Sequence, residues 1–75
     1  MNCTELKCAR IKRNIRTSQM AKVIGKSDAA WNMRERGDTS ISLKEVAPIS
    51  RQLDLSEQEF ADIFFDGELP FRKIE

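Results

Sequence analysis

The sequence predicts a small all-α domain of five helices, and three observations support this fold class. Apolar residues recur at three- and four-residue spacing through much of the chain. Ser42 and Ser56 each precede a glutamate by three residues, which is the pattern of a capping box at a helix start. Gly25 separates two periodic segments, and glycine readily adopts the positive φ of a sharp turn. The length of 75 residues suits one domain, which we expect over residues 1–65, followed by an irregular apolar tail over residues 66–75.

The first helix is expected to begin at Glu5, with Thr4 as its cap, because the Glu5 carboxylate suits the positive end of the helix dipole. It should extend to about Arg13. Asn14 tolerates the left-handed conformation that ends a helix, and Ile15 should return the chain to the core.

The second and third helices are expected on either side of Gly25. The second begins near Thr17, and the third begins after its cap, Ser27, and ends at Gly37. Ala21 is small enough to let the third helix cross closely over the second. The segment therefore predicts a helix-turn-helix.

The fourth and fifth helices are expected to open at the two capping boxes. Pro48 lies six residues past Ser42, and its missing N–H predicts a kink or a distorted first turn in the fourth helix. After Phe65, Asp66-Gly67 signals a turn and Pro70 blocks a helix, so the tail should be irregular.

The stretch TSQMAKVIGKSDAAWNMRERG, from Thr17 to Gly37, resembles the bacterial and phage repressor family of Cro and C1 type. The resemblance covers about residues 5 to 64. Other residues that match the family are Leu6, Arg10, Ile15, Ser42, Leu43, Val46, Ile49, Leu53, Leu55, Ser56 and Phe60. Lys26, Trp31 and Arg34 depart from its usual pattern. The resemblance implies a five-helix, phage-repressor-like DNA-binding domain with a structural ion pair between Arg10 and Glu35.

The net charge of +1 conceals a strong asymmetry along the chain. Residues 1–36 hold nine basic and three acidic side chains, a balance of +6, whereas residues 37–75 hold four basic and nine acidic ones, a balance of −5. A basic half that contains the helix-turn-helix suits contact with phosphates. The alternative interpretation is that these lysines and arginines only solvate helix surfaces.

Base contacts are expected from the outward side of the third helix, whose N-terminal end would enter the major groove. The predicted residues are Asp28, Ala29, Asn32 and Met33. Asn32 could pair with adenine, Ala29 could pack on a thymine methyl group, and Asp28 could accept from cytosine N4. Asp28 could instead only stabilise the helix start, since phosphates would repel its charge.

Phosphate contacts are expected from the start of the second helix, which offers free amides, and from side chains that flank the groove-facing surface. The predicted residues are Arg16, Thr17, Lys26, Ser27, Arg36, Thr39, Ser40 and Lys44. Trp31 is expected in the core, with the stem of Arg34 covering its edge and the guanidinium reaching solvent.

Catalysis has almost no support, because the chain lacks histidine, a glycine-rich phosphate loop and a nucleophile elbow. Two cysteines without histidine predict no zinc site, so we expect no metal and no cofactor, and we expect Cys3 and Cys8 to be reduced. No apolar run approaches 18 residues and no signal-peptide pattern is present, so we expect a cytoplasmic protein that spans no membrane.

The function that the resemblance implies is sequence-specific binding of double-stranded DNA by a small transcriptional regulator of phage or prophage type. The alternative is a protein-interaction module on the same scaffold, with an antirepressor- or antitoxin-like partner. Phe65, Leu69 and Phe71 could form a homodimer contact, or the tail could fold back over its own helices.

Overall fold

The computed structural model describes residues 1–65 and places all of their regular structure in helices. The helices are α1 (Cys3–Lys12), α2 (Thr17–Ile24), α3 (Asp28–Arg36), α4 (Leu43–Leu53) and α5 (Glu57–Phe64). The prediction of an all-α fold with five helices is therefore confirmed. The predicted tail, residues 66–75, lies outside the described residues.

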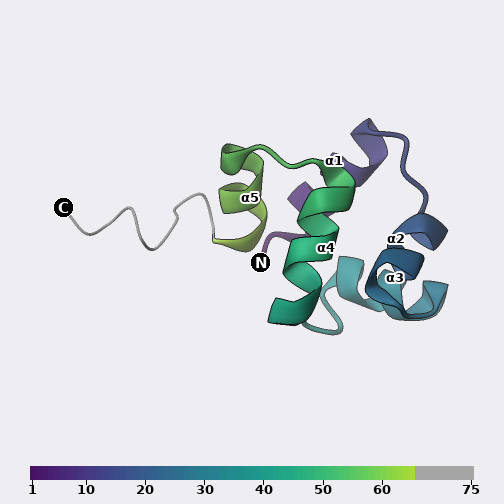
Figure 1. Ribbon diagram of the computed structural model, residues 1–75. Coiled ribbons are helices and arrows are strands. Elements are labelled where there is room, and N and C mark those ends of the chain that lie inside the picture. Colours follow the sequence, from purple (N-terminus) through teal and green to yellow (C-terminus); the bar gives the residue numbers. More distant parts are fainter. Residues whose placement is uncertain (66–75) are drawn as a thin grey trace.

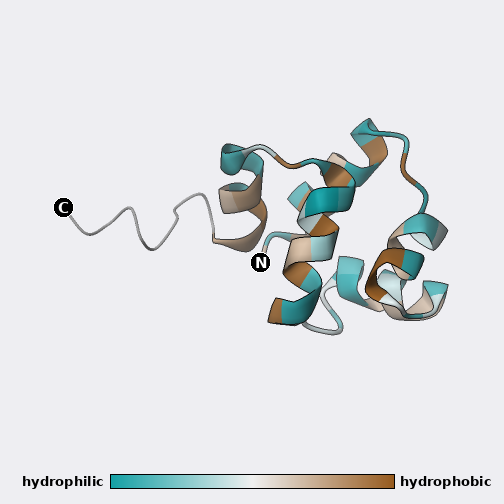
Figure 2. Cartoon of the chain, viewed as in Figure 1, coloured by the Kyte–Doolittle hydropathy of each residue, from teal (hydrophilic) through white to brown (hydrophobic). Residues whose placement is uncertain are grey.

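Helix α4 occupies the middle of the molecule, with α5 on one side and the α2–α3 pair on the other (Figure 1). Helix α1 packs against α3 and α5, while α2 packs against α3 and α4. Hydrophobic and hydrophilic bands alternate along α4, as expected of a helix with one buried face (Figure 2). The largest fully buried side chains come from all five helices and are Leu6, Met20, Trp31, Ile49, Leu53 and Ile63.

The first helix begins two residues earlier than the sequence predicts, and Thr4 is not its cap. The side-chain oxygen of Asn2 accepts a hydrogen bond of 3.1 Å from the Glu5 amide. The Asn2 amide in turn donates to the Ile63 carbonyl at 2.7 Å. Asn2 therefore fixes the start of α1 to α5, a tertiary contact that local sequence does not reveal.

The turn between α2 and α3 has the predicted conformation. Gly25 has φ +69°, and the Lys26 amide donates to the Ala21 carbonyl at 2.9 Å, which closes the turn. Ala21 is buried, as close packing of the two helices requires. Asn14, with φ 56°, has the predicted left-handed conformation after α1.

The capping box of Ser56 and Glu59 is confirmed. The Glu59 amide donates to the Ser56 hydroxyl at 3.1 Å, and the Ser56 amide donates to the Glu59 carboxylate at 3.0 Å. At the start of α4, the Ser42 amide donates to Glu45 at 3.2 Å. Helix α4 extends from Leu43 to Leu53 with Pro48 inside it, and the kink expected at this proline stays a prediction.

Candidate nucleic-acid interface

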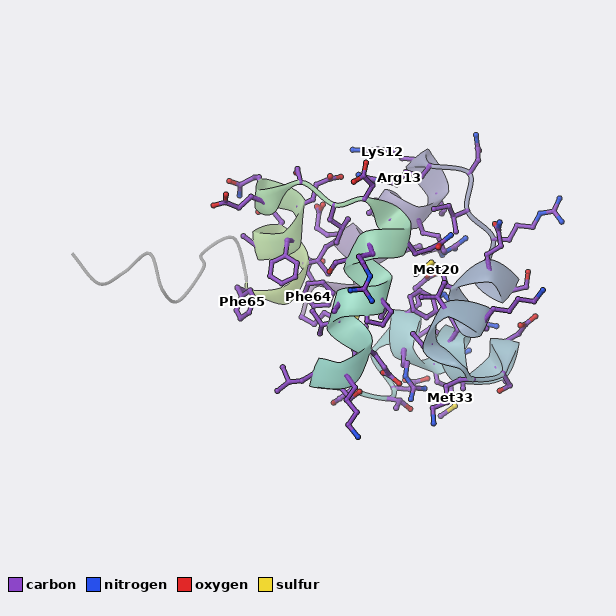
Figure 3. All side chains as sticks on the ribbon, viewed as in Figure 1. Lys12, Arg13, Met20, Met33, Phe64 and Phe65 are labelled. Atoms are coloured by element: carbon purple, nitrogen blue, oxygen red, sulfur yellow. The ribbon has the colours of Figure 1, made fainter. Side chains whose placement is uncertain are left out.

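The four residues predicted to contact bases share one exposed side of α3. We call Asp28, Ala29, Asn32 and Met33 the outer face of α3; all four are exposed. Trp31 is fully buried, as predicted. With 3.6 residues per turn, its position in the helix places it on the side opposite the outer face. In Figure 3, Met33 projects from the rim of the molecule, whereas Met20 points into its interior.

The start of α3 is fixed by its predicted cap. The Ser27 hydroxyl accepts a hydrogen bond of 3.1 Å from the Ala30 amide. Asp28 follows in the first turn, where its carboxylate favours the positive end of the helix dipole. Asp28 has no ion-pair partner among residues 1–65, so its charge faces solvent.

The residues predicted to contact phosphates come from the ends of α2 and α3, the following loop and the start of α4. Thr17 and Thr39 are half-buried, and the other six are exposed. Arg16, Lys26 and Lys44 form no ion pair within residues 1–65. The charge of Lys26 still acts on Glu45, where it helps to lower the pKa of the carboxyl. Arg36 differs, because Asp38 lies 3.0 Å from its guanidinium and offsets part of its charge.

The start of α2 retains hydrogen-bond donors. Gln19 accepts from the Arg16 amide at 2.8 Å, which satisfies the donor just before the helix. The amides of Thr17 and Ser18 have no acceptor within the helix, as at any helix start. Because they lie beside the exposed Arg16, this helix end can bind an anion.

A bidentate ion pair between Arg10 and Glu35 joins α3 to α1, and it is the pair that the family resemblance implies. The Arg10 guanidinium donates to both Glu35 oxygens, at 2.8 and 2.9 Å, and to the Ile15 carbonyl at 2.9 Å. The Trp31 indole N–H donates to the same carboxylate at 3.0 Å. The pair is mostly buried, with side-chain exposures of 11% and 7%.

A second bidentate ion pair, between Arg34 and Glu45, joins α3 to α4. It corrects the expectation that the Arg34 guanidinium reaches solvent. The Arg34 guanidinium does not reach solvent; it donates to both Glu45 oxygens at 3.0 and 3.2 Å and to the Ala30 carbonyl at 3.0 Å. Burial raises the pKa of Glu45, but the hydrogen bonds from Arg34 and the Ser42 amide outweigh it, so the pKa lies below its ordinary value. The sequence indicates Glu45 only as a cap, because this partner lies on another helix.

Internal pairing therefore uses part of the basic excess of the first 36 residues. Arg10 and Arg34 hold α3 in place, while Lys12 and Arg13 both pair with Glu59, at 3.2 and 2.7 Å. Among the residues predicted to contact phosphates, Arg16, Lys26 and Lys44 form no ion pair within residues 1–65, whereas Arg36 pairs with Asp38. Two ion pairs and the buried Trp31 thus fix the helix whose outer face stays open.

The described residues also bear on other classes of site. Within residues 1–65, no three histidine, cysteine, aspartate or glutamate side chains gather as metal ligands would. No helix in this part of the chain has the length and apolar character needed to cross a bilayer. Cys3 and Cys8 are free thiols.

Two helices joined by a glycine turn, with an exposed outer face on the second and exposed basic side chains in the flanking segments, define a helix-turn-helix domain. The chain belongs to the Cro/C1-type helix-turn-helix family, since the sequence model described as helix-turn-helix matches residues 6–60. This is a family of DNA-binding regulators. Comparisons with curated proteins and with solved structures gave no match.

Proposed function

We propose that this domain binds specific duplex DNA sequences by placing the outer face of α3 in the major groove. In this proposal it acts as a small transcriptional regulator of the phage or prophage repressor type. The observation that carries the proposal is the exposed, uncharged surface that Ala29, Asn32 and Met33 give to the outer face of α3. The segments before and after this helix also hold exposed basic side chains that form no ion pair within residues 1–65, namely Arg16, Lys26 and Lys44. Such a surface can meet base edges and phosphates together.

The outer face offers three kinds of base contact. The Asn32 amide can donate to N7 or accept from the amino group of adenine, and it can do both at once. Ala29 and Met33 supply apolar contact for the methyl group of thymine. Asp28 can accept from cytosine N4, although its place in the first turn of α3 is explained equally by the helix dipole. The proposed preference is for A·T pairs opposite Asn32.

The flanking residues would fix the register of the domain on the duplex. Arg16 and the first amides of α2 can bind one phosphate, while Lys26 and Lys44 can bind others. Arg36 would contribute less than these, since a phosphate must compete with Asp38 for its guanidinium.

Selection of bound sequences from a random duplex pool tests the proposal. Fluorescence anisotropy should then show tighter binding to the enriched duplex than to a scrambled one. The slope of log K against log salt should be about −4 to −5 if four to six phosphates are neutralised. Equal affinity for both duplexes would contradict sequence-specific readout. Absence of binding even at low salt would favour the protein-interaction alternative.

A single α3 reads only a few base pairs, so specific sites in this class commonly hold two domains about one helical turn apart. The sequence leaves two roles open for Phe65, Leu69 and Phe71, which are pairing of two copies and folding of the tail back over its own helices. Phe65 is exposed, as such a contact requires, whereas Leu69 and Phe71 lie outside the described residues.

A further inference from the structure

An apolar groove of about 650 Å³ lies between the loop after α3, helix α4 and helix α5. Its apolar lining includes Ile41, Leu43, Val46, Phe60, Phe64 and Phe65. Its volume falls within the range of ligand pockets in proteins. Figure 3 places Phe64 and Phe65 on the opposite side of the molecule from Met33. The other end of the groove is lined by Thr39 and Ser40, two of the residues predicted to contact phosphates.

The groove has two features of a surface that something covers. Leu43, on its rim, is 90% exposed, and water contact with a leucine side chain costs free energy that burial would recover. Ser50 also lines the groove, and its hydroxyl oxygen is the one buried side-chain N or O atom without a hydrogen-bond partner among residues 1–65. Because this oxygen is closed off from solvent, a backbone group entering the groove could satisfy it only after the Ser50 side chain changes rotamer.

The sequence after Phe65 provides an occupant at the groove itself. Phe65 lines the groove and packs on Phe60, with ring centroids 5.6 Å apart, so the next ten residues begin at its edge. Leu69 and Phe71 are separated by Pro70, which disfavours a helix; in an extended segment, residues two apart project to the same side. Six extended residues reach about 20 Å, which is sufficient to cross a groove of this size.

We propose that residues 66–71 of the same chain cover this groove, with Leu69 and Phe71 packed against its apolar lining. A short tether gives the tail an effective concentration in the millimolar range. A second copy at micromolar concentration must therefore bind far more tightly to displace it. The groove is then an internal contact of the monomer.

The test replaces the apolar pair in the full chain. Leu69→Asn/Phe71→Asn should lower the melting temperature by about 5 °C or more, because two buried apolar side chains are lost. The matched control, Glu68→Asn/Arg72→Asn, introduces the same residue type with no change in net charge and should melt like the parent. Sedimentation equilibrium should show a monomer for all three chains.

Native thiols provide a second measurement. Cys3 lines the groove, and Cys8 lies on the same helix outside it. In a Cys8→Ser chain, a tail that covers the groove three-quarters of the time would slow disulfide exchange at Cys3 with an aromatic disulfide reagent. The apolar-pair substitution should then raise the rate about fourfold. In a Cys3→Ser chain, the rate at Cys8 should not change.

Equal melting of the apolar-pair and control variants would overturn the proposal. So would a loss of stability or of Cys3 protection that accompanies a concentration-dependent dimer, because the occupant would then be a second copy. If Cys3 reacts in neither chain because it packs on Gly37, with its sulfur 3.0 Å from where a Cβ would stand, the melting comparison decides.

Discussion

Glu35 is the residue that fixes the orientation of α3. Its carboxylate accepts two hydrogen bonds from Arg10 and one from the Trp31 indole, so three donors share one mostly buried group. The family resemblance implies the pair with Arg10. The bond from Trp31 also had a signal in the sequence, because residues four apart lie on the same side of a helix. Trp31 therefore combines a core position with a polar contact.

A double-mutant cycle should show strong coupling within this pair. Arg10→Met leaves the Glu35 charge buried without its partner and should lower the free energy of unfolding by about 3 kcal/mol. Glu35→Gln keeps an acceptor for Trp31 and isolates the loss of charge. Because each single variant strands its partner, the double variant should lose less than the sum of the two. Urea unfolding measures this, and additive losses would show that the side chains do not interact energetically.

The ion pair between Arg34 and Glu45 is a contact that could not be predicted from the sequence. Each residue had a local explanation, as a snorkelling side chain and as a helix cap. Their contact depends on how α3 packs against α4, which no spacing within either helix encodes. The orientation of α3 therefore rests on one pair that the sequence suggests and one that only the fold reveals.

At the scale of helices, start signals were predicted better than contacts between helices. Ser27 and Ser56 cap the helices as predicted, because a cap depends on residues within one turn. Asn2 displaced Thr4 as the first cap, since its amide also bonds to α5. Glu59 was predicted only as half of a capping box, yet it also joins α5 to the end of α1 through Lys12 and Arg13.

The ion pairs of Glu59 with Lys12 and Arg13, which join α5 to the end of α1, should weaken in acid. The hydrogen bond from Arg13, followed by that from the Ser56 amide, lowers the pKa of Glu59 from 4.5 to about 2. A carboxyl whose folded pKa is depressed stabilises the fold above its unfolded pKa. That contribution is lost as pH falls from about 4.5 towards 2.

Glu59→Gln keeps the capping oxygen and removes the charge. Free energies of unfolding measured between pH 5 and 2 should therefore depend less on pH in the variant than in the parent. At the upper end of this range, the variant should be less stable than the parent by about 1 kcal/mol, given partial solvent screening. Arg13→Met should flatten the same window, since it removes the largest cause of the shift. An unchanged pH dependence in both variants would mean that these ion pairs contribute nothing to stability.

For the whole molecule, the sequence indicated the five-helix order and the side of α3 that faces solvent, because both follow from periodicity and turn residues. The balance of +6 over residues 1–36 overestimates the positive charge that is available to DNA. Of the nine basic residues in the first half, Arg10, Lys12, Arg13 and Arg34 pair with glutamates inside the domain. The apolar groove beside α5 had no counterpart in the sequence analysis, since its lining comes from segments far apart in the chain.

The most direct test of sequence readout by α3 compares two alanine variants on the enriched and scrambled duplexes. Asn32→Ala should weaken binding to the enriched duplex by about tenfold or more and leave the scrambled duplex almost unaffected, because it removes a contact to a base. Lys44→Ala, the control from the same surface, should weaken both duplexes about equally and reduce the salt slope by about 1, because it removes a contact to a phosphate. Equal weakening of both duplexes by Asn32→Ala, or no weakening of either, would contradict readout by the outer face of α3.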